Sequence, residues 1–392
     1  MTPPPLDQRS EVNRLVATLE RHVRQEYARP RVKRDAHPKM HGCVLAQFRV
    51  DDDVPADLRW GVFAHPGRLF DAWMRFSNAF RLQHDIEFET RGLGLKLLGV
   101  PGNRLVPDIA DDEPHTQDFL FATHDAFFLP NVDEYAEFAQ ATAAGPMAIG
   151  QFFLRRPRLW RGFGAMLRSS VLPAPSPLAI PYYTQTPYRL GPKQAVKLQA
   201  RPLWTPELRA SLPAPSLFRI KTIAGNAALF VRELSGTKAT AEDFCDRYIA
   251  ARDLLRHAMM SFLSRYDAWF EILVQTTDRS PAMPIEDPTV SWGEHMSPFR
   301  RVALVRVPRQ VFWPESGMPD EVKEAAANMV DLGENMSFNP WHALSDHEPL
   351  GGINQARRRV YPAIVGTRRA LNGVTPKTPS EEYRRLRPIV EM

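Results

Sequence analysis

The sequence has little cysteine, no long apolar run and less glycine than proline. Its two cysteines, Cys43 and Cys245, form no CxxC or other metal-ligand spacing, and two are too few for a disulfide framework. No run of about 18 apolar residues is present, as a membrane-spanning helix would require. Residues 1–9 are polar and proline-rich and lack the apolar centre of a signal peptide. We therefore expect a soluble, cytoplasmic protein.

Charge and nucleotide-binding motifs give no support for nucleic acid or nucleotide as a partner. Lysine and arginine number 50 against 45 acidic residues, a formal net charge of +5. An acidic run at residues 51–53 also interrupts the basic segments. No GxGxxG motif or phosphate loop follows a predicted strand, and no internal repeat is visible. We expect no nucleic-acid partner.

Apolar periodicity predicts a protein of mostly β structure, with one helix ahead of the strands and further helices in the later part of the chain. The 36 prolines lie mainly between apolar runs, where they stiffen loops without breaking a sheet. Period-two or short apolar runs predict strands at Val44–Val50, Leu93–Val100, Phe119–Ala122, Leu229–Leu234, Trp269–Gln275 and Val302–Val307. Helical spacing predicts helices at about 10–27, Glu242–Leu263, Glu321–Leu332 and about Gln355–Leu371. This pattern indicates an antiparallel sheet or barrel.

The stretch Met147–Pro192 mixes aromatic residues with arginines and continues into a proline-rich segment containing Tyr182-Tyr183. One interpretation is a long insertion whose aromatic side chains pack on the barrel while its arginines are solvated. The other is contact with a membrane surface. The sequence leaves both open.

The segment from 357 to 368 carries the most specific pattern. Arg357, Tyr361 and Arg368 are separated by four and seven residues, so a helix places them on one face. Two fixed cations favour the ionised phenol, and a tyrosinate oxygen is a good ligand for ferric iron. The alternative is a basic surface helix with a half-buried tyrosine.

This helix resembles the proximal helix of haem catalases, in which arginines stand four residues before and seven after the ligand tyrosine. Pro362 follows the tyrosine, as in that family. Four further segments resemble catalase motifs in the same order along the chain. They are Arg34-Asp35-Ala36-His37-Pro38-Lys39, Arg75-Phe76-Ser77-Asn78, Arg91-Gly92-Leu93-Gly94-Leu95-Lys96 and Phe338-Asn339-Pro340-Trp341.

The resemblance implies an α+β fold, a catalase-like antiparallel β-barrel with inserted and C-terminal helices. It implies a helical arm over 1–33 and a haem-binding domain over 34–392, with the barrel at about 34–310 and the proximal helix at about 355–371. The cofactor implied is haem b, with Tyr361 as the iron ligand. The implied cofactor-binding residues are Arg34, Arg75, Ser77, Arg357, Tyr361 and Arg368.

On the distal side the resemblance implies His37 as the acid–base catalyst, and His41 is a second candidate. Catalases carry an asparagine in the segment that here reads His115-Thr116-Gln117-Asp118-Phe119, and this sequence has none there. Thr116 or Gln117 would have to take its place and orient the peroxide.

These departures make the chain more similar to divergent catalase-related proteins of the peroxidase or allene oxide synthase-like kind. The resemblance then implies a haem-dependent peroxidase or hydroperoxide-converting enzyme with weak catalase activity. Its partners would be hydrogen peroxide or an organic hydroperoxide and an unknown electron donor. Peripheral membrane contact and a homo-oligomer stay open. The alternative is a non-enzymatic haem carrier or sensor on the same fold.

Overall fold

A computed structural model describes residues 6–26, 32–79, 85, 89–105, 112–144, 146–171, 175–213, 253–277 and 280–391. The strand expected at 229–234, the residue Cys245 and the first part of the helix expected at 242–263 lie outside these residues. The remainder of that helix is α8 (Leu254–Leu263).

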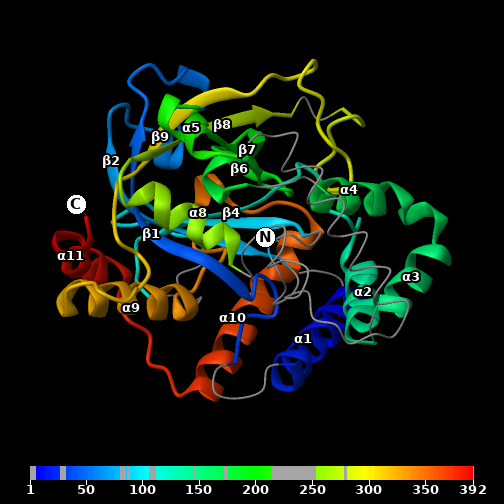
Figure 1. Cartoon of the computed structure of the whole chain (residues 1–392). Coiled ribbons are helices and arrows are strands. Elements are labelled where there is room, and N and C mark those ends of the chain that lie inside the picture. The colour runs from blue at the N-terminus through cyan, green and yellow to red at the C-terminus, as the bar shows by residue number, and fades with distance from the viewer. Residues whose placement is uncertain are drawn as a thin grey trace.

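The centre of the molecule is an antiparallel β-barrel, which confirms the expected fold class (Figure 1). The described strands are β1 (Lys39–Val50), β2 (Leu69–Asn78), β3 (Arg91–Leu97), β4 (Gln117–Ala122), β5 (Tyr182–Tyr183), β6 (Tyr188–Leu190), β7 (Gln194–Pro202), β8 (Ala268–Thr276) and β9 (Arg300–Val307). Their order is β5-β4-β3-β2-β1-β9-β8-β7-β6, and β5 also pairs with β7. Eight strands therefore close a ring, and β6 extends it beside β7.

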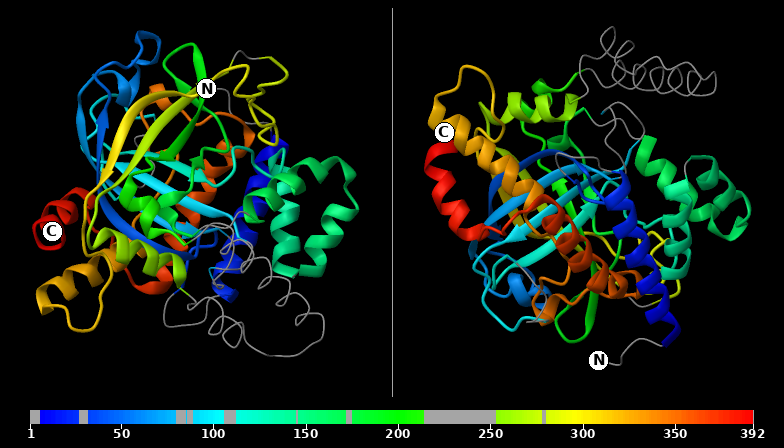
Figure 2. Two further views of the ribbon diagram at one scale, coloured as in Figure 1. Left: turned by 45° about the horizontal axis from the view of Figure 1, so that its top comes forward. Right: turned by 90° about the horizontal axis from the view of Figure 1, so that it is seen from below.

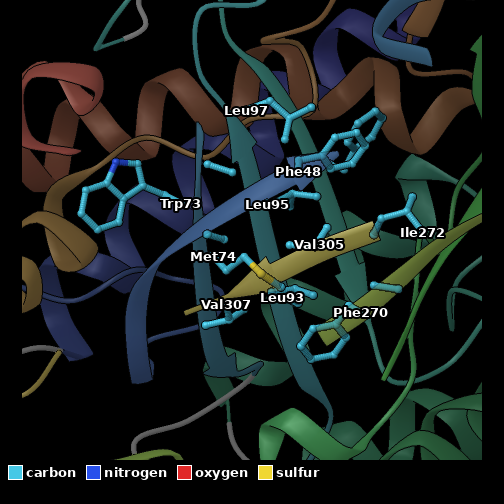
Figure 3. Close-up of a cluster of buried hydrophobic side chains, with 14 of the residues drawn as sticks. Phe48, Trp73, Met74, Leu93, Leu95, Leu97, Phe270, Ile272, Val305 and Val307 are labelled. Atoms are coloured by element: carbon cyan, nitrogen blue, oxygen red, sulfur yellow. The ribbon is translucent and has the colours of Figure 1, made fainter. Parts of the chain in front are cut away.

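The barrel interior is filled by apolar side chains from alternate positions of several strands, because successive residues of a strand point to opposite faces. Figure 3 shows Phe48, Leu95, Phe270 and Val305 converging there from four strands. Each of these four side chains is completely buried. Within the described part of the chain, the barrel interior thus belongs to the packed apolar core.

Helices cover the barrel from several sides. In addition to α8 they are α1 (Leu6–Glu26), α2 (Val132–Ala144), α3 (Pro146–Leu154), α4 (Trp160–Val171), α5 (Pro206–Ser211), α9 (Asp320–Asn335), α10 (Gly352–Asn372) and α11 (Pro379–Val390). Figures 1 and 2 show α2, α3 and α4 on one side of the barrel and α9 and α11 on the other. Among the described helices, none is both long and apolar enough to cross a membrane.

A second apolar cluster joins α1, α2, α3 and α10 beside the barrel. The helix expected at about 10–27 is α1, and its buried positions Leu15, Leu19 and Val23 recur at helical spacing in this cluster. Contacts of α1 with both α2 and α10 make the N-terminal segment one wall of the cluster.

The stretch Met147–Pro192 is only partly an insertion, which corrects the first of its two interpretations. Its first half forms α3 and α4, but Tyr182–Tyr183 is β5, the strand that closes the barrel. Tyr182 is fully buried, and its hydroxyl donates to the Pro177 carbonyl at 2.9 Å. A two-residue strand has no periodicity to detect, so the sequence pattern could not reveal it.

The helix expected at about 355–371 is α10, and it continues through Pro362. It begins after Gly351 (φ 84°) and ends at Gly373 (φ 63°), whose left-handed conformation favours glycine. The helix is therefore delimited by two glycines, and the Arg357–Arg368 segment lies well inside it.

Candidate functional site

A cavity of about 250 Å³ lies between the barrel and the second apolar cluster. Strands β2, β3 and β4 and the segment before β1 supply one wall, and α1, α2 and α10 supply the other. Predicted site residues from both walls meet here. His37 and Arg75 come from the barrel wall, while Arg357 and Tyr361 come from α10. The cavity is therefore the place where the predicted motifs converge.

His37 is held in the barrel wall by its backbone and its ring. Its φ of 63° is in the left-handed region that residues other than glycine rarely adopt, and its N–H donates to the Ala79 carbonyl at 2.8 Å. The ring packs against Gly92, where an added Cβ would lie 2.1 Å from the histidine Cε1. Only a glycine at this position of β3 leaves room for the imidazole.

The ring nitrogens of His37 have distinct environments. Ser77 Oγ lies 3.1 Å from Nδ1 and also donates to the Gly92 carbonyl at 3.5 Å. The serine oxygen then accepts from Nδ1–H, which leaves Nε2 as the unprotonated nitrogen. Burial, followed by the charges of Arg75 and Arg34, lowers the pKa of His37 to about 3. The imidazole is therefore neutral at physiological pH and can accept a proton.

His41, the second distal candidate, does not line the cavity. Its side chain is buried, with Nε2 2.7 Å from Asn78 Oδ1 and Nδ1 3.8 Å from Asp85 Oδ1. Of the two histidines, the structure thus brings only His37 to the cavity.

Three arginines gather where α9 ends. Arg34 donates to the Met336 carbonyl at 2.5 Å, Arg75 donates through Nε to the Gly333 carbonyl at 2.9 Å, and Arg368 donates to the Glu334 carbonyl. The last four carbonyls of a helix lack intrahelical donors and carry partial negative charge. The C-terminus of α9 therefore fixes three cations from distant parts of the chain at the cavity.

The cavity has a clear excess of positive charge. Among the described residues that line it, the guanidinium groups are those of Arg34, Arg75, Arg357 and Arg368, whereas Asp35 is the one carboxyl group. Burial raises the pKa of Asp35 to about 7, so near neutrality even this charge is only partly present. Burial lowers the pKa of Arg368 to about 10. Such a site is suited to an anionic ligand.

The face of α10 that carries Arg357, Tyr361 and Arg368 borders the cavity, since all three residues line it. Arg357 donates to Asn354 Oδ1 at 3.0 Å and to Thr186 Oγ1 at 3.2 Å. Both acceptors are uncharged, so these hydrogen bonds orient the guanidinium group without offsetting its positive charge. Tyr361 itself is half-buried and lines the cavity.

No protein-family model matches the sequence, and no curated protein matches it. Among solved structures, a fungal catalase superposes with a TM-score of 0.61 at 15% identity, covering 97% of this chain and 67% of that one. The chain has the catalase fold. Catalase A from Saccharomyces cerevisiae gives a TM-score of 0.58 at 16% identity, over 94% of this chain and 66% of that one. A bacterial catalase gives 0.58 at 14%, over 96% and 64%. The chain thus spans about two thirds of the length of these catalases.

Within this catalase fold, Thr116 and Gln117 are not brought to the cavity. The Gln117 amide group donates to the Asp118 carbonyl at 3.2 Å and accepts from the Leu344 N–H at 3.0 Å. In the β3–β4 register, Ala122 pairs with Gly92 beside His37, while Gln117 pairs with Leu97. Five residues of strand separate the two positions by roughly 16 Å. We therefore leave both residues out of the proposed chemistry.

Lys96, the lysine of the catalase-like segment at residues 91–96, does not line the cavity. Lys96 is fully buried, and its Nζ lies 2.8 Å from Asp118 Oδ1. Asp118 Oδ2 also lies 3.0 Å from His342 Nδ1 and accepts from the Asn339 N–H at 2.9 Å. This ionic cluster fixes the segment after Phe338, a residue that lines the cavity. Lys96 therefore helps to hold in place the segment that carries Phe338, through its ion pair with Asp118.

Several lining residues were not predicted from the sequence. Asp35 belongs to the catalase-like segment at residues 34–39. Its position between Arg34 and His37 is the sequence feature that could have indicated a place in the site. Phe127, Phe128 and Phe138 form an apolar part of the helical wall. They belong to a turn and to α2, and only the packing of α2 on α1 brings them to the cavity.

Proposed function

We propose that this chain binds haem b in the cavity, with Tyr361 as the iron ligand, and metabolises a peroxide with His37 as the acid–base residue. The observation that carries the proposal is the convergence of His37 and Tyr361, from different walls, on one cavity lined by four arginines. The catalase fold is consistent with this chemistry.

The residues of the cavity fit a haem. A haem carries two propionates, and the guanidinium groups of Arg34, Arg75 and Arg368 are the candidates to bind them. Two of these side chains, Arg34 and Arg368, have a buried Nε without a hydrogen-bond partner, so donors remain for a ligand. The lining side chains Leu93, Phe121, Phe338, Val360 and Ile364 offer apolar contacts to the porphyrin.

Tyr361 would hold the ferric iron through its phenolate oxygen. Arg357 lies four residues earlier on the same face of α10, and its hydrogen-bond acceptors among the described residues are both uncharged. Arg357 is therefore the residue proposed to pair with the phenolate. When bound, the haem would supply the redox chemistry.

His37 would move the proton. Its Nε2 accepts the proton from one peroxide oxygen and returns it to the other, which leaves as water or as an alcohol. The low pKa of His37 keeps the ring in the accepting form, and Ser77 holds the tautomer. General acid–base catalysis of this kind contributes roughly 10²–10⁴-fold to a rate.

We further propose that organic hydroperoxides are better substrates than hydrogen peroxide. The helical wall is rich in apolar side chains, including Phe127, Phe128, Phe138 and Ile353, and these suit a hydrocarbon chain. No asparagine side chain lines the cavity within the described residues. The chain would then work as a peroxidase or hydroperoxide-converting enzyme with weak catalase activity.

The first test is the absorption spectrum of the purified protein and of a Tyr361→Phe variant. We expect a ferric high-spin Soret band for the unmodified protein, and at least tenfold weaker haem binding for the variant because phenylalanine offers no oxygen ligand. Tyr135→Phe is the matched control, since Tyr135 lines the same cavity and should leave the haem in place.

Substrate turnover then separates enzyme from carrier. Multiple turnovers of hydrogen peroxide or a fatty-acid hydroperoxide, with an added electron donor, would support the enzyme, and the faster substrate identifies the class. Stoichiometric bleaching of a bound haem would favour the carrier or sensor. Unchanged haem binding in Tyr361→Phe would contradict the proposed ligand.

A further inference from the structure

The surface formed by α3, α4 and the turn between them exposes large apolar side chains together with arginines. Met147 is 79% exposed, Leu154 72%, Trp160 56% and Leu167 44%. Eleven large apolar side chains are exposed among the described residues, and these four of them fall within about 20 consecutive residues. Exposed apolar side chains gathered in this way usually mark an interaction site.

The charge of this surface has one sign. Residues 146–171 contain five arginines and no acidic residue or lysine. Arg156 and Arg158 form ion pairs with Glu137 and Glu134 of α2. Arg155 and Arg161 are exposed, and neither has an ion-pair partner within the described part of the chain. The unpaired cations Arg155 and Arg161 thus directly follow the exposed Leu154 and Trp160 in the chain.

This surface lies directly behind the wall of the cavity. Gly162 of α4 packs so closely on the turn before α2 that an added Cβ would lie 1.9 Å from the Phe128 carbonyl oxygen. Phe152 and Phe153 of α3 contact Phe138, with ring centroids 5.6 and 5.8 Å apart. Phe128 and Phe138 line the cavity, so one layer of packing separates it from α3 and α4.

We propose that this surface docks onto an anionic lipid bilayer. We call it the docking patch: Met147, Leu154, Arg155, Trp160, Arg161 and Leu167. A bilayer offers both an apolar layer for the exposed side chains and a negative surface for the arginines, which a neutral apolar partner does not. The patch lies on the side of the barrel opposite α11 (Figures 1 and 2).

Docking would bring the bilayer next to the helical wall of the cavity. This second step rests on the proposed function, because it implies that a lipid hydroperoxide passes from the membrane into the site. The docking itself does not depend on haem, so vesicle binding and peroxide turnover can succeed or fail separately.

The test measures co-sedimentation of the full chain with two kinds of vesicle at physiological salt. One contains phosphatidylcholine alone, and in the other about one lipid in three is phosphatidylglycerol. We expect binding to the anionic vesicles only. The double variant Arg155→Gln/Arg161→Gln should bind about 30-fold more weakly, since each arginine near an anionic surface contributes about fivefold. Leu154→Ser/Trp160→Ser should also lose binding.

Arg384→Gln on α11 and Trp204→Ser before α5 are matched controls, because both side chains are exposed outside the patch. Thermal unfolding of each variant verifies folding. Equal binding of the unmodified chain to both kinds of vesicle, or to neither, would overturn the proposal. It would also be overturned if the patch variants bound normally, or if they only converted a dimer into a monomer in size-exclusion chromatography.

Discussion

Ser77 Oγ and His37 Nδ1 lie 3.1 Å apart, although the two residues are 40 positions apart in the chain. The contact exists because β2 carries Ser77 past the segment that precedes β1, where Lys39 of β1 pairs with Asn78 of β2. It assigns the proton to one nitrogen of the imidazole and leaves the other to face a ligand.

Replacing Ser77 with alanine should slow peroxide turnover per bound haem about tenfold. The imidazole would lose the acceptor that fixes its tautomer while keeping its place against Gly92. The turnover number per bound haem measures the effect. Ser264→Ala, at the exposed end of α8, is the control, and equal turnover in both variants would contradict the positioning role.

The two distal candidates can be separated by paired substitutions. His37→Gln should lower turnover per haem by roughly 10²–10⁴-fold, because the proton-accepting nitrogen is removed. His41→Gln should destabilise the fold through its buried bond to Asn78 and leave turnover per haem close to that of the unmodified chain. Steady-state kinetics and thermal unfolding give the two readouts. The reverse result would transfer the catalytic role to His41.

Thr186→Val should weaken haem binding about tenfold. The substitution removes one of the two oxygens that accept hydrogen bonds from Arg357 and preserves the side-chain volume, so the guanidinium is less well fixed beside Tyr361. Titration of the protein with haem measures the change. Thr184→Val is a comparison at another buried threonine, one that bonds only to the Leu198 backbone. An equal effect there would indicate general loss of structure.

Asp35→Asn should stabilise the protein without ligand, and more so as the pH rises. The pKa of Asp35 is raised from 3.8 to about 7, so the folded state binds a proton more tightly than the unfolded state does. The contribution of Asp35 to the free energy of unfolding is fully present below pH 3.8, and it is lost as the pH rises to about 7. Denaturant unfolding of both proteins at several pH values gives the difference. A difference that is constant with pH would contradict the raised pKa.

The sequence determined the local arrangement of the site. Residues four and seven apart on α10 had to share one face, and the catalase-like segments at residues 34–39, 75–78 and 338–341 contribute Arg34, His37, Arg75, Ser77 and Phe338 to one cavity. The strands β1, β3, β4, β8 and β9 were likewise predicted from their apolar runs, whereas the long strands β2 and β7 were not.

Only the tertiary structure decided which of these groups can act together. It brought His37 to the cavity and placed His41 behind it, and it carried Thr116 and Gln117 roughly 16 Å along the barrel from the histidine. It also joined Arg34 to a carbonyl 302 residues away at the end of α9. Periodicity records which side chains share a face of one element. Contacts between distant elements depend on how those elements pack, and a single sequence carries no local signal for that.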